Sequence, residues 1–353
     1  MRIEYLVILF ALSQFVWAQS ELLVTLNKQQ LAQWGYTTSL STLNLNKRSI
    51  VNIEAGTFRE FTNLKKLILT SNHLTSIRAD MFDGLGATLT ELSLNQNNIS
   101  HIDGDAFHDL AQLSNGLNLA GNKIGVINDE WFTKLRKLKV LDLSLNKIKM
   151  IEHASFERLN GLQVLRLTDN EIEYIESESF ASLAQLDELY LNKNYLREIE
   201  DGTFEGLTDL SKLDLSENGL DQLQDHCFLG MEFLSTLFLS NNNLRTIKPN
   251  AFSILSSLEW LVLKRNRIQT LNEESFAGLV NLEELDLSEN SIHEIRAEYF
   301  SHLQSISYLR LNMNPFEVKI IGKESGIGEG AEKFSKQEKN TEFLLKPILD
   351  LNM

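Results

Sequence analysis

A repeat of 24 or 25 residues runs through most of this 353-residue chain and restricts its fold more than any other feature. One unit reads L-x-x-L-x-L-x-x-N, continues x-(L/I)-x-x-(I/L), and ends x-x-x-x-F-x-x-L. The first unit begins at Leu40, and about twelve follow one another to residue 316. Arg48 takes the asparagine position in the first unit. The later units carry Asn72, Asn97, Asn122, Asn146, Asn170, Asn194, Asn218, Asn242, Asn266, Asn290 and Asn314 there. Self-similarity at this period indicates stacked units.

Each part of the unit has a physical role. The L-x-L alternation predicts a short strand with its leucines facing inward and the residue between them facing outward. The asparagine amide both donates and accepts hydrogen bonds, so it can bond its own turn and the neighbouring turn. A phenylalanine lies ten residues after that position in eleven units, from Phe58 to Phe300, and is expected in the same core. One unit cannot bury its apolar face alone, so we expect an α/β solenoid with a parallel β-sheet on one side and looser turns on the other.

This pattern resembles the extracellular leucine-rich repeat proteins of the 24-residue type. They include Toll-like receptor ectodomains, slit, chaoptin and the secreted leucine-rich immune proteins of insects. The resemblance covers residues 40–316. It implies a horseshoe whose concave face carries the parallel sheet and binds other molecules without catalysis.

The first eighteen residues predict a secretory signal peptide. Arg2 supplies a short basic region, Tyr5 to Trp17 are mostly apolar, and Ala18 is a small residue before a cleavage point. Later in the chain no apolar stretch reaches the length of a membrane span. The sequence therefore predicts a secreted protein without a stable membrane anchor. With 33 Lys+Arg against 48 Asp+Glu and a net charge of −15, the composition argues against nucleic-acid binding.

The two ends depart from these relatives, whose solenoids are commonly sealed by disulfide caps. Residues 19–39 form a capping segment without cysteines. Its apolar residues are expected to cover the end of the solenoid: Leu22, Leu23, Val24, Leu26, Leu31 and Trp34. At the other end, residues 314–316 resemble the start of a C-terminal cap, but Val318 and Ile320 stand at its cysteine positions. Either this cap is cysteine-free, or the chain leaves the family there through splicing or truncation. Residues 317–353 are charged, contain clustered glycines and predict a flexible tail.

Two single residues carry chemical hypotheses. Cys227, the one cysteine, precedes Phe228 at a position where other units hold small residues such as Ala106. It is either a small residue tucked into the core or an unpaired thiol that forms an intermolecular disulfide. Asn98 begins the sequon Asn-Ile-Ser and is a candidate for N-glycosylation.

The outward-facing strand positions are mostly polar or charged, which makes a few apolar ones stand out. Phe238, Val262 and Trp260 form an adjacent group, and Tyr190 and Tyr308 flank it. Aromatic residues are enriched where proteins bind each other. We therefore expect these five residues to contact a protein partner, with a glycan as the alternative ligand. Packing against the chain's own tail, or ordinary scattered surface residues, would also account for them.

The sequence lacks the short motifs that are typical of several classes of enzyme. It contains no nucleophile elbow, H-E-x-x-H motif, phosphate loop or dinucleotide fingerprint, so no enzyme activity and no cofactor are expected. His101, Asp103, Asp105 and His108 are interpreted as a solvated turn rather than a metal site. A secreted recognition protein in innate immunity or cell signalling is the preferred reading. The alternatives are a structural protein of extracellular matrix or cell adhesion, and a truncated isoform of a larger receptor.

Overall fold

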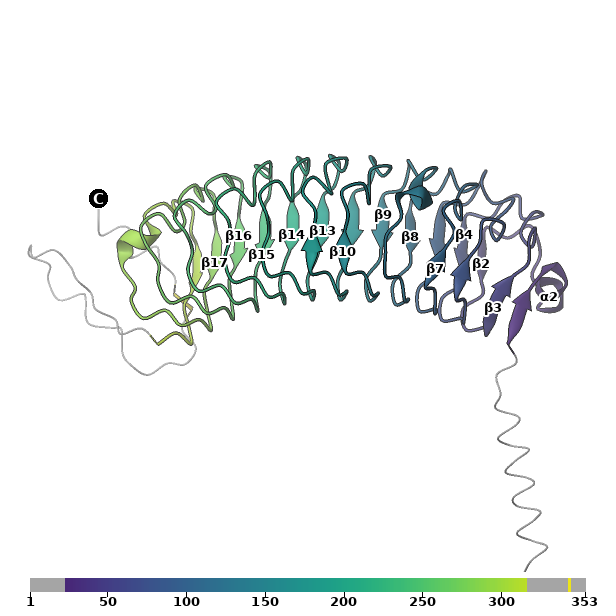
Figure 1. The fold of residues 1–353 in the computed structure, drawn as a ribbon, viewed down its shortest axis with the longest axis horizontal. Coiled ribbons are helices and arrows are strands. Elements are labelled where there is room, and N and C mark those ends of the chain that lie inside the picture. Colours follow the sequence, from purple (N-terminus) through teal and green to yellow (C-terminus); the bar gives the residue numbers. More distant parts are fainter. Residues whose placement is uncertain (1–22, 316–341, 344–353) are drawn as a thin grey trace, which may run out of the picture.

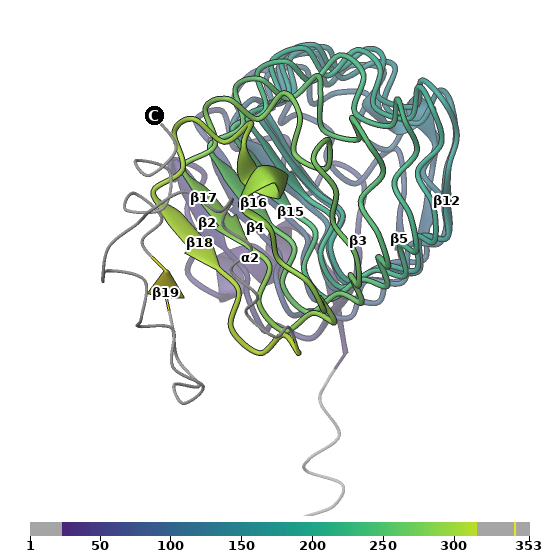
Figure 2. The ribbon, with the colours of Figure 1, turned by 90° about the vertical axis from the view of Figure 1, so that its left-hand side faces the viewer.

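The computed structural model describes residues 23–315 and 342–343. The predicted signal peptide, Leu22 and nearly all of the predicted tail lie outside these residues. Within them the fold expected from the repeat is confirmed: the chain forms a gently curved parallel-sheet solenoid (Figure 1). Seen towards one end, the strands of the main sheet stack behind one another on one side, and the turns close the solenoid on the other (Figure 2).

Each turn of the solenoid contributes one three-residue strand to the main sheet. The parallel strands are β2 (Thr42–Asn44), β4 (Lys66–Ile68), β6 (Glu91–Ser93), β8 (Gly116–Asn118), β9 (Val140–Asp142), β11 (Val164–Arg166), β13 (Glu188–Tyr190), β14 (Lys212–Asp214), β15 (Thr236–Phe238), β16 (Trp260–Val262), β17 (Glu284–Asp286) and β18 (Tyr308–Arg310). Their register aligns equivalent repeat positions, so that Leu213 lies opposite Leu237 and Leu237 opposite Leu261. The middle leucine of each strand is buried, and its two neighbours reach the surface in rows except at Asp286 of β17, which is buried.

The core behind the sheet is a continuous apolar layer. Its leucines and isoleucines are almost completely buried, and so are the phenylalanines of the second half of each repeat. Phenylalanines of neighbouring repeats stack: the rings of Phe156 and Phe180 are 5.9 Å apart with planes 10° from parallel, and those of Phe180 and Phe204 are 6.1 Å apart. Such offset pairs add to the burial of apolar area, so the stacked rings help to hold several neighbouring turns together.

The repeated asparagines hold neighbouring turns together by hydrogen bonds. The amide nitrogen of Asn170 donates to the backbone oxygens of Leu143 (3.0 Å) and Leu167 (3.1 Å), and its oxygen accepts from the backbone N–H of Ile148 at 3.2 Å. The same three kinds of contact recur at every asparagine of the series from Asn72 to Asn314. Each amide therefore satisfies polar backbone groups that the turns would otherwise bury without partners.

The second half of each repeat is built mainly of turns. Besides β3 (Ile50–Ile53), four short parallel strands lie there: β5 (Ser76–Ile77) pairs with β7 (His101–Ile102), and β10 (Met150–Ile151) pairs with β12 (Tyr174–Ile175). Two 3₁₀ segments, η1 (Asp129–Phe132) and η2 (Ala297–Phe300), occur in the same half. The N-terminal helix α2 (Lys28–Gln33) is the single α-helix within the described ranges. Nor do those ranges include a helix long and apolar enough to cross a membrane.

The N-terminal end of the solenoid is covered by residues 23–40 without any disulfide. Strand β1 (Val24–Leu26) pairs in parallel with β3 (Ile50–Ile53), and α2 packs Leu31 onto the first repeat. Leu26 and Leu31 are buried, and Val24 and Trp34 are partly buried against the core. The expectation that Leu23 would share this role is wrong, because Leu23 immediately precedes β1 and is 62% exposed.

The C-terminal end of the main sheet carries one antiparallel addition. Strand β19 (Glu342–Phe343) pairs with β18, with Leu309 opposite Phe343 and Arg310 opposite Glu342 (Figure 2). A segment of the C-terminal region therefore lies along the last strand of the sheet. This is the one part of residues 317–353 that the structure describes.

Candidate functional site

The solvent-facing surface of the main sheet, called the sheet face below, brings three of the predicted residues together. Phe238 at the end of β15 lies directly opposite Val262 at the end of β16. Trp260 begins β16 and lies between Thr236 and Glu284 of the neighbouring strands. Its side chain is 49% exposed, whereas Phe238 and Val262 are half-buried. We call Phe238, Trp260 and Val262 the apolar cluster.

Tyr190 lies on the same face but is separated from the apolar cluster by strand β14. Lys212 of that strand fills the gap, with its Nζ 5.1 Å from the centre of the Tyr190 ring and 5.6 Å from that of Phe238. Arg166 lies over the Tyr190 ring at 5.4 Å. The Tyr190 hydroxyl donates to Glu188 at 2.6 Å, and burial together with this bond raises the pKa of the phenol. Tyr190 is thus held by its own neighbours.

Tyr308 flanks the apolar cluster on the other side. It begins β18, lies opposite Glu284 and is 49% exposed. The Glu284 carboxylate accepts a hydrogen bond from Arg310 at the other end of β18. Glu284 therefore stands between Tyr308 and Trp260, and the two aromatic residues are two strands apart, or roughly 10 Å.

Most charges beside the apolar cluster are already paired within the chain. Glu289 accepts from Arg265 at 2.6 Å and from Lys264 at 3.0 Å, and these bonds hold its pKa below the usual value. Asp286 is buried and accepts from the backbone N–H of Ser288 at 2.8 Å and from its hydroxyl.

Two acidic side chains in this region point to solvent. Glu259 precedes Trp260, and Glu283 precedes Glu284, so that both stand at the rim of the apolar cluster. Each is exposed. The cluster is therefore an apolar patch beside negative charge.

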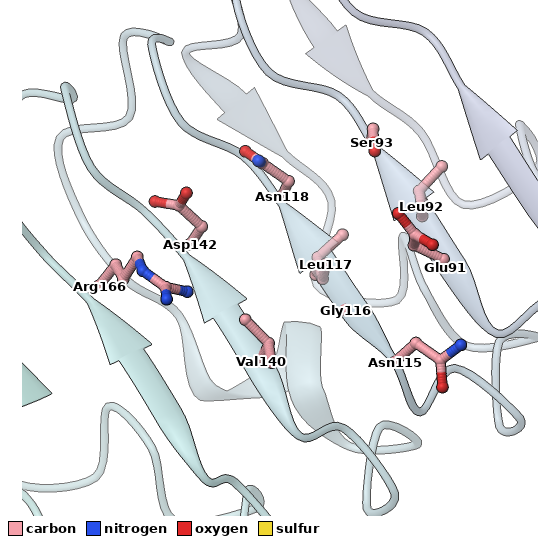
Figure 3. Close-up of a pocket in the computed structure, with 10 residues that line it drawn as sticks. All are labelled: Glu91, Leu92, Ser93, Asn115, Gly116, Leu117, Asn118, Val140, Asp142 and Arg166. Carbon is pink, nitrogen blue, oxygen red and sulfur yellow. The ribbon is translucent and has the colours of Figure 1, made fainter. Parts of the chain in front are cut away.

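A shallow polar hollow lies on the sheet face farther towards the N-terminus (Figure 3). It arises at Gly116, which has no side chain where the neighbouring strands present Glu91 and Val140. Its volume is about 320 Å³. The polar residues that line it are Glu91, Ser93, Asn115, Asn118, Asp142 and Arg166. Sequence reasoning missed this hollow, although Gly116 stands in a row otherwise made of larger residues.

The remaining predicted residues lie away from the sheet face. Asn98 follows the buried Asn97 and is half-buried, and Ser100 of its sequon is exposed. Cys227 is 1% exposed, and burial raises the pKa of its thiol to about 12. A second chain could not reach this sulfur without local opening of the repeat, so the structure contradicts the predicted intermolecular disulfide and favours the buried small residue.

The histidines and aspartates of residues 101–108 do not form a metal site. His101 pairs with Asp103 at 3.2 Å, and the Nδ1 of His108 lies 2.9 Å from the backbone oxygen of Asp105. Within residues 23–315 and 342–343, no group of three or more His, Cys, Asp or Glu side chains could hold a metal ion.

Comparison with known families identifies the repeat. A family model described as leucine rich repeat matches residues 38–88, 62–115, 115–172, 160–220, 208–268 and 256–316. Together these matches cover most of the chain. No curated protein gives a match.

Several solved structures are similar to this chain. The TLR13–ssRNA13 complex has 31% identity and a TM-score of 0.79, with 86% of this chain and 43% of that chain covered. The Toll–Spatzle complex of Drosophila has 26% identity and a TM-score of 0.72, with 78% and 38% covered. An internalin of Listeria monocytogenes, at 23% identity and a TM-score of 0.61 with 78% and 75% covered, shares the fold alone. The chain spans less than half the length of the two receptor chains.

Proposed function

Because the chain belongs to the leucine-rich repeat family, we propose that it is a non-catalytic recognition module that binds a protein partner on its sheet face. In the horseshoe architecture this surface is the concave one. Similarity to Toll and to TLR13, each solved in a complex with another molecule, supports a role in recognition. The chemistry of the partner is set by this chain's own surface.

The observation that carries the proposal is the apolar cluster. Most outward positions of the main sheet hold polar or charged residues, yet Phe238 and Val262 lie side by side and Trp260 stands exposed next to them. Exposed large aromatic residues in a contiguous group are typical of interface hot spots. Leaving Trp260 half exposed forgoes part of its burial energy, about 1 kcal/mol or more, which binding would recover.

The charges at the rim indicate the chemistry of the partner. Lys264, Arg265 and Arg310 are occupied by Glu289 and Glu284, whereas the carboxylates of Glu259 and Glu283 point to solvent. We therefore expect a protein segment that places one or two apolar side chains on the cluster and a lysine or arginine beside these carboxylates. Complementary charge would speed the encounter and fix its orientation.

A nucleic-acid ligand fits this surface less well. The TLR13 structure contains single-stranded RNA, but phosphate binding depends on clustered lysine and arginine. Here the chain carries a net charge of −15, and Lys264, Arg265 and Arg310 near the cluster are paired with carboxylates. Single-stranded RNA is therefore included in the test as a competing ligand.

The test uses the purified protein as bait in extracellular fluid of the source organism, with captured proteins identified by mass spectrometry. Phe238→Ala and Trp260→Ala should each weaken capture of a specific protein by at least ~2 kcal/mol, or about thirtyfold. Phe233→Ala is the matched control, because Phe233 is 67% exposed but precedes β15 and lies outside the sheet. Unchanged capture by both cluster variants would rule out this site. Saturable binding of single-stranded RNA, without capture of a specific protein, would overturn the proposal of a protein partner.

An extracellular location in innate immunity or cell signalling is part of the same proposal. Its support is the predicted signal peptide and the similarity to Toll. Expression in animal cells should release the protein into the medium with residue 19 as its N-terminus, which N-terminal sequencing would show. Higher expression after microbial challenge would favour an immune role, whereas insoluble deposition around cells would favour the structural matrix alternative.

A second candidate ligand is a glycan in the hollow at Gly116. Its lining combines carboxylates, amides and a guanidinium, which are groups that hydrogen-bond sugar hydroxyls. An added Cβ at Gly116 would be 3.7 Å from its nearest neighbour, so Gly116→Leu can fill the hollow without a clash at that atom. Loss of binding on a glycan array in Gly116→Leu, with binding kept in Trp260→Ala, would assign glycan recognition to the hollow.

A further inference from the structure

A stripe of exposed apolar side chains lies on the flank of the solenoid that carries β10 and β12, and Figure 2 places this flank across the molecule from β17 and β18. The stripe consists of Val126 (64% exposed), Met150 (40%) and Tyr174 (40%). These residues occupy the same place in three consecutive repeats, four positions after the ladder asparagine. Met150 and Tyr174 are directly opposite in the β10–β12 register.

The stripe is confined to these repeats. In the other repeats from residue 40 to residue 298 the same position holds a polar or charged residue: Asn52, Ser76, His101, Glu198, Gln222, Thr246, Thr270 and Glu294. Val126, Met150 and Tyr174 are each exposed to solvent, so the core of the solenoid does not require an apolar residue at this position. Its presence in three adjacent turns makes a continuous surface rather than scattered single residues.

The two charges that precede Met150 and the two that precede Tyr174 are opposite, position for position, whereas Glu152 and Glu176 follow them with the same charge. The repeat of Met150 reads Asn-Lys-Ile-Lys-Met and that of Tyr174 reads Asn-Glu-Ile-Glu-Tyr. Lys147 and Lys149 are exposed beside Met150, and Glu173 is exposed beside Tyr174. Within the chain, Lys147 reaches Glu171 at 3.1 Å.

Further acidic residues extend the negative half. The Tyr174 hydroxyl donates to Glu200 at 3.3 Å, and Glu176 and Glu198 stand close enough to act on it electrostatically. Lys123, in the repeat of Val126, extends the positive half. Two residues are exceptions: Arg197 lies among the acidic residues, and Glu152 is exposed in the positive half.

We propose that this flank binds a second copy of the same chain. A twofold axis between β10 and β12, parallel to the strands and in the plane of contact, exchanges the two repeats. It places Met150 against Tyr174 of the second copy, Lys147 against Glu171 of the second copy, and Lys149 against Glu173 of the second copy. The apolar pairs then lie at the centre, with opposite charges on one side of them. On the other side Glu152 approaches Glu176 of the second copy, and Val126 lies opposite Glu198 of the second copy, which weakens the association.

The charge pattern selects this orientation over the other way of packing the same two surfaces. A twofold axis at right angles, along the row of repeats, would place each repeat against itself. The lysine-bearing repeat would then lie against the lysine-bearing repeat of the second copy, and the glutamate-bearing repeat against its counterpart, which brings like charges close together. A contact without a twofold axis would leave a binding surface open on each copy and continue into a ring or a filament.

The size of the surface sets the strength of the association. Four repeats, each contributing about six residues, span roughly 20 Å by 20 Å, or about 400 Å² per copy. Stable protein pairs bury about 800 Å² per partner, and the net charge of −15 opposes the approach of two copies. We therefore expect a weak dimer with a dissociation constant in the micromolar range or above.

The test is sedimentation velocity of the full chain over a range of micromolar concentrations, with folding checked by circular dichroism. Wild type should show a concentration-dependent monomer–dimer equilibrium. Lys149→Glu and Glu173→Lys should each raise the dissociation constant about tenfold, because each dimer contains the contact twice. The double variant that exchanges both charges should regain wild-type dimerisation, since the pair is restored in both contacts.

Met150→Asp should abolish the dimer, and Thr270→Asp is its matched control at the equivalent exposed position of another repeat. Three results would overturn the proposal: a monomer throughout the concentration range, single charge variants that dimerise like wild type, or a double variant that fails to regain dimerisation. Polymers that grow beyond the dimer would instead indicate the open contact and would also overturn it. Each readout is independent of the partner proposed for the sheet face.

Discussion

At the residue scale, the asparagines between the turns carry the strongest local requirement. Asn170 is buried and makes three hydrogen bonds to backbone groups of two turns. We expect Asn170→Ala to lower the free energy of unfolding by about 2–4 kcal/mol, because it leaves a buried N–H and two carbonyls without their partner. Asn160→Ala, at an exposed position, should change it by no more than about 0.5 kcal/mol.

Urea unfolding followed by circular dichroism would measure both. Asn170→Asp separates the two functions of the amide, because it keeps an acceptor for Ile148 and removes the donors to Leu143 and Leu167. A loss in Asn170→Ala no larger than that in Asn160→Ala would show that water replaces the amide and that the asparagine series is not required for stability.

The single cysteine gives a pH-dependent prediction at the same scale. Burial raises the pKa of the Cys227 thiol from 9.0 to about 12, so the thiolate is about a thousandfold rarer in the folded chain than in the unfolded one at neutral pH. Labelling with a thiol reagent at pH 8 should be slow in the native protein and fast in guanidinium. Rapid stoichiometric labelling of the native protein would contradict the buried position.

The same shift affects stability at high pH. The folded thiol holds its proton more strongly than the unfolded one, so the protonated thiol contributes to the free energy of unfolding. This contribution is complete below pH 9 and is lost as the pH rises towards 12. Cys227→Ala should remove this part of the pH dependence. Alanine is a fitting replacement, because Ala106 and Ala251 occupy the equivalent buried position in other repeats.

At the scale of the element, the N-terminal cap shows how the chain closes one end without a disulfide. Leu31 of α2 is 2% exposed and packs on the core, and Asn27 caps the helix by accepting from the N–H of Gln30 at 2.9 Å. Leu31→Ala should destabilise the protein by about 2–4 kcal/mol through lost burial and the resulting cavity. Leu23→Ala, at an exposed position immediately before β1, should be nearly neutral.

Thermal unfolding of the two variants beside wild type would test this. Equal melting temperatures for all three would mean that α2 is dispensable and that the first repeat is stable without a cover. A larger effect of Leu23→Ala than of Leu31→Ala would indicate that β1 rather than α2 closes the end.

The sequence predicts some features of the strands and turns and not others. The strands, the buried leucines and the stacked phenylalanines such as Phe180 follow from the period alone, because one repeat determines the environment of the next. The exposure of Leu23 and the bridging of Tyr190 and Phe238 by Lys212 do not, since they depend on side-chain positions across strands. The hollow at Gly116 and the flank stripe at Met150 are partly predictable from the sequence. Their residues are visible as departures from a row, but only the register shows which departures touch.

At the scale of the whole molecule, a solenoid is stabilised by contacts between neighbouring turns, so its two ends differ from its middle and from each other. The N-terminal turn is covered by α2 and β1, and Leu26 and Leu43 are completely buried. The last turn is less enclosed: Asn314 is only half-buried, and Leu311 is 6% exposed. In a nearly one-dimensional structure, opening begins where the coupling to a neighbour is weakest.

We therefore expect amide hydrogen exchange to reveal an asymmetric gradient. The N–H of Ile148, bonded to buried Asn170, should exchange more slowly than the N–H of Ile292, bonded to half-buried Asn314. The first repeats should resemble the middle rather than the last repeat, because α2 covers them. Exchange measured by mass spectrometry on peptides from each repeat would check this order. Faster exchange at the N-terminal repeats than at the C-terminal ones would mean that the cysteine-free cap does not protect its end, and that the pairing of β19 with β18 is the stronger closure.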